Sequence, residues 1–235
     1  MIRGLYFPAL SRQSLSQYYK RGGKKEFYAI YNCQHNYENI ARDCKQRCVY
    51  CDVHVDECGG EKFSLDHFRP KNLFGDKFNG ILKIHPYNLH LSCQKCNVLK
   101  SDDWKGCVDT QDGVTYLSKR GYIDRFKVDA SDYFNVDASG KVVSINTFGP
   151  GEYMIGRLHL NRTNRVYLRK LREVTNKSDI VLRKLDAKYA QVMDDWEADV
   201  LSPEQAKKEL KSLKSLMSRY IQLASIPFPL MRAQS

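Results

Sequence analysis

The chain has 235 residues, of which 42% are hydrophobic and 28% are charged, and this balance excludes a wholly disordered or collagen-like protein. No apolar run approaches the roughly 20 residues that a membrane span requires, and the first residues lack the apolar core of a signal peptide. We therefore expect a cytoplasmic protein that does not associate with membranes. The formal net charge of +11 by itself permits nucleic acid, an anionic membrane surface or an acidic partner without choosing among them.

Residues 1–43 are expected to form a basic N-terminal helical segment. The stretch 18–27 (YYKRGGKKEF) combines basic and aromatic side chains around two glycines, and a helix is expected over 27–44. Two interpretations of the basic stretch remain open: a solvated arm beside the helix, or a contact with phosphate.

Residues 44–107 are expected to contain the chemistry, because they hold seven of the eight cysteines and four of the six histidines. Residues 62–65 follow two glycines and alternate between polar and apolar side chains, which predicts a short strand. A second strand is expected around 81–84 and a short helix over 96–105. The prediction is therefore a strand, strand, helix unit.

The remainder divides into a β-hairpin extension, 108–151, and a helical C-terminal region, 152–235. Two β-rich runs over 133–145 predict the hairpin, and the sequence TFGPG at 147–151 predicts the end of regular structure. Beyond it, apolar residues recur at helical spacings of three and four.

Two helix starts are expected in the C-terminal region. Ser178 is the expected N-cap of one helix. The run from Ser202 to Gln205 predicts the start of another, because it has the form of a capping box with Pro203 at the first helical position.

Two C-x-x-C motifs lie in the core region, with 41 residues between them. In a reducing compartment, closely spaced cysteines more often bind metal than form disulfides, and four thiolates from two such motifs can close a tetrahedral zinc site. The expected ligands of this structural zinc are Cys48, Cys51, Cys93 and Cys96. The alternatives are buried cysteines without metal, or replacement of one ligand by Cys44 or Cys58.

Three polar residues between and after the motifs suggest a second site. Asp66 and the amide oxygen of Asn97 are oxygen ligands of the kind that Mg²⁺ or Mn²⁺ accepts. His67 has a side chain that can take a proton near neutral pH. The alternative is that the Asp66 and His67 pair makes only a structural hydrogen bond.

The order and spacing of these residues resemble the HNH endonucleases, a family with the ββα-metal fold. The residues that carry the resemblance are Cys48, Cys51, Asp66, His67, Pro70, Asn88, Leu89, Cys93, Cys96, Asn97 and Lys100. The resemblance implies that His67 is the general base, that Asp66 and Asn97 hold the catalytic divalent ion, and that Asn88 orients the histidine loop. Many members have a third histidine where this chain has Asn97.

A narrower resemblance involves the string DHFRPK at 66–71 and the segment IGRLHLNR at 155–162. Together they look like the HNH subunits of bacterial anti-phage operons, such as Septu systems and some retrons. That resemblance implies a role in defence against phage and an ATPase partner that controls the nuclease.

The chemistry implied is hydrolysis of a phosphodiester, with His67 deprotonating a water and one divalent ion stabilising the added negative charge. Arg69 and Lys100 are expected to contact phosphate, with surface charges as the alternative interpretation. Three further histidines, His85, His90 and His159, are expected to pack or to make hydrogen bonds.

The C-terminal region adds a basic run, because 157–188 contains ten Lys and Arg against three acidic residues. Such a run can neutralise the DNA backbone or form a docking face for a partner protein. Phosphate contacts position a duplex without reading its sequence, so no sequence preference is predicted.

The sequence thus predicts an α+β fold: a zinc-stapled ββα-metal (HNH) core with an N-terminal helical arm and a helical C-terminal region. The expected function is metal-dependent cleavage of DNA. Two other interpretations remain, a zinc-stabilised nucleic-acid-binding module without chemistry and an interaction subunit that serves an ATPase partner. DNA and RNA present the same diester, so the residues do not separate these substrates.

Overall fold

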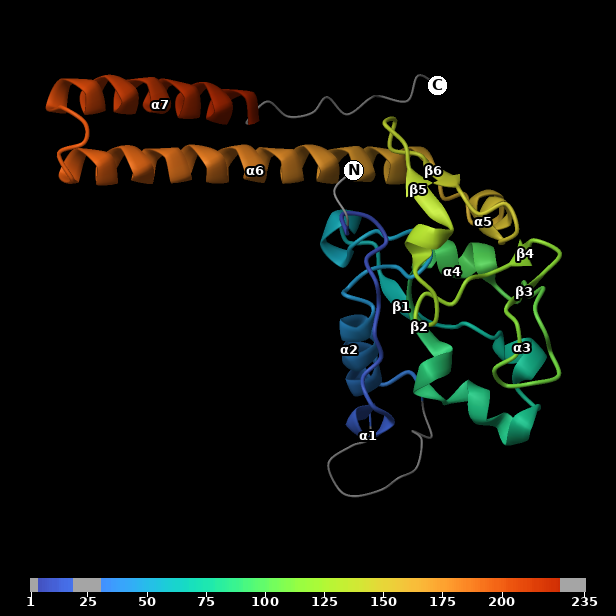
Figure 1. Ribbon diagram of the computed structural model, residues 1–235. Coiled ribbons are helices and arrows are strands. Elements are labelled where there is room, and N and C mark those ends of the chain that lie inside the picture. The colour runs from blue at the N-terminus through green and yellow to red at the C-terminus, as the bar shows by residue number, and fades with distance from the viewer. Residues whose placement is uncertain (1–3, 19–30, 225–235) are drawn as a thin grey trace. The chain divides into compact units, whose positions relative to one another are not determined.

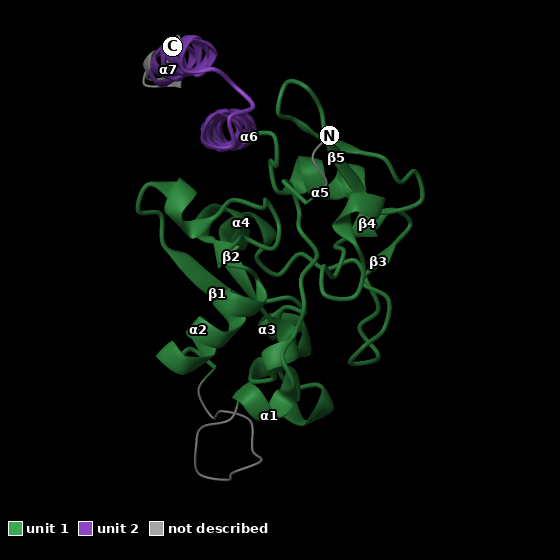
Figure 2. Cartoon of the chain, turned by 60° about the vertical axis from the view of Figure 1, so that its left-hand side comes forward, with its two compact units in different colours: residues 1–170 green, residues 171–235 purple. Residues whose placement is uncertain are grey.

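The computed structural model describes residues 4–18 and 31–224 (Figure 1). It divides into two compact units, residues 1–170 and residues 171–235, shown in separate colours in Figure 2. The described residues form a mixed fold of helices and three small two-stranded sheets. Most of the basic stretch over 18–27 lies outside the described residues.

The centre of unit 1 is a strand, strand, helix arrangement, as predicted. Strand β1 (Phe63–His67) pairs antiparallel with β2 (Leu89–Cys93), and α4 (Gln94–Lys100) follows β2 directly. Ser101 has a φ of 45°, which no right-handed helix can contain, so α4 ends short of the predicted residue 105.

The predicted position of the second strand is wrong. Residues 81–84 belong to or directly follow the 3₁₀ segment η2 (Phe78–Lys83), in which Asn79 and Gly80 have φ values of 56° and 72°. These left-handed conformations bend the chain and exclude an extended strand there. The strand forms instead at β2, whose five residues are all buried.

One apolar cluster covers a face of this sheet. The helix α2 (Gln34–Asp43), which is the described part of the helix expected over 27–44, contributes Ile40 and Ala41. These pack against Leu89 and Leu91 of β2, while the short α1 (Leu15–Tyr18) supplies the buried Tyr18. The sheet and α2 therefore fold as one layered unit (Figure 1).

The rest of unit 1 consists of short elements around a larger apolar cluster. Strands β5 (Phe134–Val136) and β6 (Val142–Ser144) form the predicted hairpin, and α5 (Gly151–Arg157) begins where the predicted break ends. The other short elements of unit 1 are η1 (Val55–Cys58), α3 (Lys71–Phe74), η3 (Pro86–Asn88), β3 (Tyr116–Leu117), β4 (Arg120–Gly121) and η4 (Ala130–Asp132). The cluster combines Phe7, Trp104 and Val142, so distant segments share one core.

Two long helices account for the C-terminal region: α6 (Thr163–Glu197) and α7 (Pro203–Ala224). The predicted N-cap at Ser178 is wrong, because that residue lies inside α6, whose sequence contains no glycine or proline to interrupt it. The predicted capping box is confirmed: the Gln205 amide donates to Ser202 Oγ at 3.3 Å, and the Ser202 amide donates to Gln205 Oε1 at 2.9 Å.

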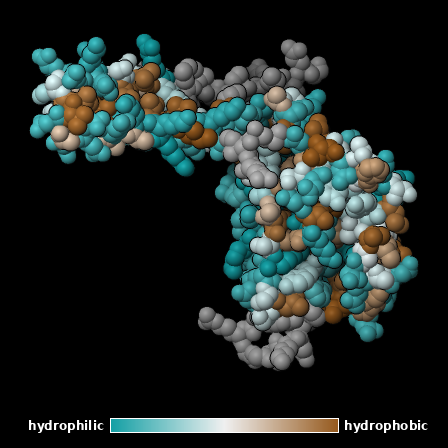
Figure 3. Space-filling model, viewed as in Figure 1, coloured by the Kyte–Doolittle hydropathy of each residue, from teal (hydrophilic) through white to brown (hydrophobic). Residues whose placement is uncertain are grey.

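Unit 2 is held by a small apolar cluster between these helices, formed by Val192, Ala206 and Leu213 with flanking leucines. Apolar side chains also gather on the surface near the connection between α6 and α7, where Val200 is 70% exposed (Figure 3). Among the described residues, no helix combines the length and the apolar character needed to cross a membrane.

Candidate metal centre and adjoining cavity

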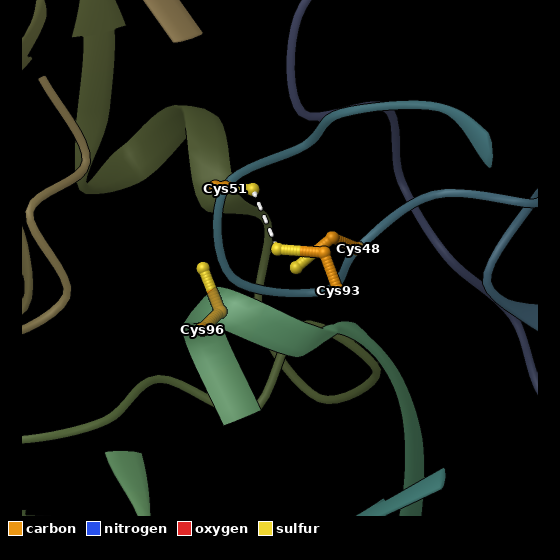
Figure 4. Close-up of side chains that lie close together, drawn as sticks. All are labelled: Cys48, Cys51, Cys93 and Cys96. Atoms are coloured by element: carbon orange, nitrogen blue, oxygen red, sulfur yellow. Dashed lines mark hydrogen bonds between the residues drawn. The ribbon is translucent and has the colours of Figure 1, made fainter. Parts of the chain in front are cut away.

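The four predicted zinc ligands meet in one place. The Sγ atoms of Cys48, Cys51, Cys93 and Cys96 all lie within 4.8 Å of one another, and all four residues are buried. The Sγ atoms of Cys51 and Cys93 are 3.7 Å apart, and their side chains point toward the same centre (Figure 4). Zinc–sulfur bonds of about 2.3 Å give a tetrahedron with edges of about 3.8 Å, so the donor set fits zinc.

Local structure explains how the two motifs converge. In the first motif the chain turns back on itself, because the Asp52 amide donates to the Cys48 carbonyl at 2.9 Å and Asp52 has a φ of 64°. In the second motif Cys93 ends β2 and Cys96 lies in the first turn of α4. The Val49 amide donates to the Leu91 carbonyl at 2.9 Å, which ties the first motif to β2.

No other group of three or more Cys, His, Asp or Glu side chains in the described part of the chain has this geometry. Cys44, one alternative ligand, lies in the cluster beneath the sheet and its Sγ accepts from the Leu91 amide at 3.4 Å. Burial raises the pKa of Cys44 to about 11, which keeps that thiol protonated. The four-cysteine set is therefore the candidate metal centre.

A cavity of about 360 Å³ lies beside β1 and α4, and it brings together three of the predicted site residues, Asp66, His67 and Asn97. Its remaining lining residues are Tyr31, Leu65, Pro70, Lys71, Asn72, Ser101 and Asp102. The end of β1 and the helix α4 thus place a carboxylate, an imidazole and an amide around one cavity.

The imidazole of His67 is held in one orientation. Its Nε2 lies 2.8 Å from the carbonyl oxygen of Lys83, and a carbonyl oxygen only accepts, so Nε2 carries the proton. In the neutral ring the lone pair is then on Nδ1. Burial lowers the pKa of His67, although the Lys83 carbonyl and Asp66 act in the opposite direction. The ring is therefore neutral near pH 7 and able to accept a proton.

Asn88 holds the two segments that meet at this histidine. Its Oδ1 accepts from the Arg69 amide at 2.9 Å, and its Nδ2 donates to the carbonyl oxygens of Leu82 at 2.8 Å and Arg69 at 3.1 Å. One side chain thus joins the loop after β1 to the segment that carries Lys83.

Asp66 already has protein partners. Tyr50 donates its hydroxyl to Oδ2 at 2.5 Å, and the Lys100 ammonium lies 3.1 Å from the same oxygen. Lys100 also donates to the His67 carbonyl at 2.8 Å. Asn97 is oriented as well, since its Nδ2 donates to Ser64 Oγ at 3.1 Å.

The two residues expected to contact phosphate are internal. Lys100 is fully buried against Asp66, and Arg69 is 4% exposed. The guanidinium of Arg69 donates to the Gly113 carbonyl at 2.6 Å and stacks 4.9 Å from the Trp104 ring centre. Neither side chain is therefore exposed for a direct contact with phosphate. The exposed cation at the cavity is Lys71.

Two of the three other histidines for which packing or hydrogen bonding was expected, His85 and His90, behave in that way. His85 Nδ1 accepts from the Tyr87 amide at 3.0 Å, and His90 is fully buried with its ring stacked 4.6 Å from that of Phe68. His159 is exposed in the connection after α5, outside the helix in which it was expected, with a φ of 47°.

Sequence reasoning missed several residues of this site. Lys83 acts through its backbone carbonyl, which no side-chain pattern reveals. Tyr31 meets the His67 ring edge to face at 4.5 Å from a segment far away in the sequence. Asp102, on the cavity wall, accepts a hydrogen bond from Asn72 at 2.6 Å. Its position just beyond the end of α4 could have indicated from the sequence that it lies near Asn97.

Comparison with family models, with curated proteins and with solved structures finds no match to this chain.

Proposed function

We propose that the chain is a metal-dependent nuclease of the HNH type that hydrolyses phosphodiester bonds in DNA. The observation that carries this proposal is the orientation of His67. Its Nε2 is bonded to a backbone carbonyl, so the basic Nδ1 belongs to a ring that shares its cavity with Asp66 and Asn97. This combination of base and oxygen ligands suits attack by water on a phosphodiester.

Asp66 and Asn97 fit a hard divalent cation, Mg²⁺ or Mn²⁺, because both side chains carry oxygen ligands and both residues line one cavity. An ionised carboxylate has roughly four lone-pair sites, and Tyr50 and Lys100 use only part of them. When bound, the cation supplies positive charge next to the phosphate oxygens and the leaving oxygen.

The protein's own residues then have distinct tasks. His67 takes the proton of a water at Nδ1, and the resulting hydroxide attacks phosphorus in line with the leaving oxygen. The Lys83 carbonyl and Asn88 keep the ring in place. Because the ring is already oriented, little conformational entropy is lost on reaching the transition state. The lowered pKa of His67 keeps the base free of its proton at neutral pH.

Plasmid cleavage tests the proposal. Purified, zinc-loaded protein is incubated with supercoiled plasmid in EDTA, Mg²⁺ or Mn²⁺. His67→Ala is compared with His159→Asn, a control at an exposed histidine, where asparagine tolerates the positive φ. We expect metal-dependent nicking that is lost in the first variant and retained in the second. Full activity of His67→Ala would overturn His67 as the base.

One observation favours a second candidate function, a zinc-stabilised nucleic-acid-binding or interaction subunit without cleavage of its own. The ammonium of Lys100 neutralises Asp66, the residue that would hold the catalytic cation. This candidate predicts DNA binding that is the same with and without Mg²⁺ and no product at any metal concentration. Fluorescence anisotropy with labelled DNA, run beside the plasmid assay, separates the two.

The narrower resemblance adds a proposal about context: the nuclease serves anti-phage defence under the control of an ATPase partner. We expect the full chain to co-purify with the product of a neighbouring gene and to cleave faster in that complex. Failure to bind any neighbouring product would count against the partner while leaving the nuclease proposal intact.

A further inference from the structure

Two arginines from the start of the C-terminal region contact the four-cysteine centre. Arg162 precedes α6, and its Nη2 lies 3.7 Å from the Sγ of Cys51, 3.5 Å from that of Cys93 and 3.7 Å from that of Cys96. A single guanidinium nitrogen is thus within hydrogen-bond reach of three of the four sulfur atoms.

Arg165, in the first turn of α6 and three residues after Arg162, contacts the same centre. Its Nη2 lies 3.4 Å from Cys93 Sγ and 2.7 Å from Glu61 Oε2. The side chain is only 3% exposed. Cys93 therefore accepts from both arginines, and Glu61 fixes the second of them.

Charge explains why two cations, one of them buried, belong here. A zinc ion with four thiolates carries a net charge of −2, and a charge of that size inside a protein is costly unless opposite charges lie close to it. The two guanidinium groups bring +2 and place N–H donors on the sulfur atoms. Partners of this kind orient metal ligands and tune the affinity of the metal site.

The same face of α6 continues inward with Arg169. It is 2% exposed and donates to the carbonyl oxygens of Gly140 at 3.1 Å and Leu160 at 2.8 Å. Positions 162, 165 and 169 follow the helical spacing of three and four. Part of the basic run that was expected to face DNA or a partner is therefore internal. The prediction of such a contact now applies only to the other basic residues of 157–188.

We propose that Arg162 and Arg165 support the metal centre by contacting its cysteine ligands rather than the metal itself. Through these contacts they couple metal binding to the packing of the first turn of α6 against the loops of the two C-x-x-C motifs. With metal bound, the thiolate centre neutralises both guanidinium groups and holds the chain at 162–165 against the loops of the two C-x-x-C motifs. Without metal, the arginines lose most of their anionic partners, and this segment loosens. The inference is independent of nuclease activity.

Metal release from the full-length, zinc-loaded protein is the first test. Arg162→Gln and Arg165→Gln are compared with Arg183→Gln, which removes the same charge from an exposed position of α6. A chromophoric chelator reports the rate of zinc loss, and circular dichroism reports folding. We expect release about 10-fold faster in the first two variants, since loss of an outer partner typically costs 10–100-fold in affinity. Release at the wild-type rate in both would overturn the proposal.

A second test uses the wild-type chain, so it does not depend on the folding of a variant. Trypsin is added to zinc-loaded and to chelated protein, and mass spectrometry follows cleavage after Arg162 and Arg165. The exposed Arg183 and Lys184 serve as internal controls. We expect the first two sites to be protected only with zinc, and the controls to be cut at similar rates in both states. Equal cleavage after Arg162 and Arg165 with and without zinc would contradict the coupling.

Discussion

The two sites of unit 1 share the helix α4 but are built on opposite principles. The candidate metal centre gathers four buried cysteine side chains around a point where their sulfur atoms could hold a metal ion. The adjoining cavity gathers side chains of different kinds around open space, and its three predicted site residues are each bonded to another part of the protein. The first arrangement is suited to holding the fold together, and the second to presenting groups to a substrate.

The two sites also differ in how much each interaction contributes to the free energy of folding. Metal binding to a structural zinc site contributes about 10 to 16 kcal/mol that is coupled to folding. A neutral hydrogen bond contributes about 1 kcal/mol, so the cavity residues are held by many small terms. We therefore expect changes at the two sites to differ in size and in kind.

The largest effect is expected at the metal centre. Cys96→Ser removes one ligand and should abolish tight zinc binding and cooperative unfolding of unit 1, because the site is closed and buried. Cys33→Ser is the matched control: this residue is outside the centre and precedes α2, where serine is a favoured N-cap. Zinc content by mass spectrometry and thermal unfolding are measured. Retention of zinc by Cys96→Ser would refute the four-ligand site.

The next effect is expected at Lys100. Lys100→Met removes the only cation beside Asp66 in the described structure and leaves a buried carboxylate with one neutral partner. We expect a loss of about 3 to 5 kcal/mol in the free energy of unfolding. Lys71→Met, at the exposed end of the cavity, should cost less than about 0.5 kcal/mol. Urea unfolding compares them, and equal stabilities would show that the ion pair contributes nothing.

A smaller effect is expected at Asn88. Asn88→Ala leaves the Arg69 amide and the Leu82 carbonyl without their partner, which should cost about 1 to 3 kcal/mol of stability. If the nuclease proposal holds, cleavage should fall more than stability requires, because the segment with Lys83 no longer positions His67. Cleavage at the wild-type rate, measured where the variant is folded, would remove Asn88 from the positioning role.

The smallest effect is expected from pH. Burial lowers the pKa of His67 and, more strongly, of the fully buried His90, where Arg12 acts in the same direction. A histidine whose folded-state pKa is lowered takes up its proton on unfolding. Its contribution to stability is therefore complete above the unfolded pKa of about 6.5 and declines below it, by at most about 1.4 kcal/mol per pH unit.

Urea midpoints between pH 7.5 and 5.5 test this sign for the wild-type chain and for His90→Phe. The phenylalanine keeps the stacking on Phe68 and cannot be protonated. We expect the variant to lose less stability on acidification than the wild-type chain. An equal loss would show that His90 does not carry the pH dependence.

Much of the site followed from local sequence. The C-x-x-C spacing located all four cysteines of the metal centre, and the strand after two glycines led to Asp66 and His67. The hairpin over 133–145 and the capping box at Ser202 were also predicted, because each depends on a few neighbouring residues. The position of the second strand was not predicted, because residues 81–84 have strand-like side chains but follow Asn79 and Gly80 in left-handed conformations, and the strand forms at β2 instead.

The sequence by itself determined which residue types can bind metal and transfer a proton, because thiolate, carboxylate and imidazole chemistry belongs to the side chain. Only the tertiary structure decided which charges are internal. Lys100 meets a carboxylate 34 positions away, and Arg165 meets one 104 positions away. A basic side chain is stable inside the protein only beside carboxylates or carbonyl oxygens that accept its hydrogen bonds, and folding alone brings these partners together. That is why a run of arginines expected at the surface includes two that contact the metal centre.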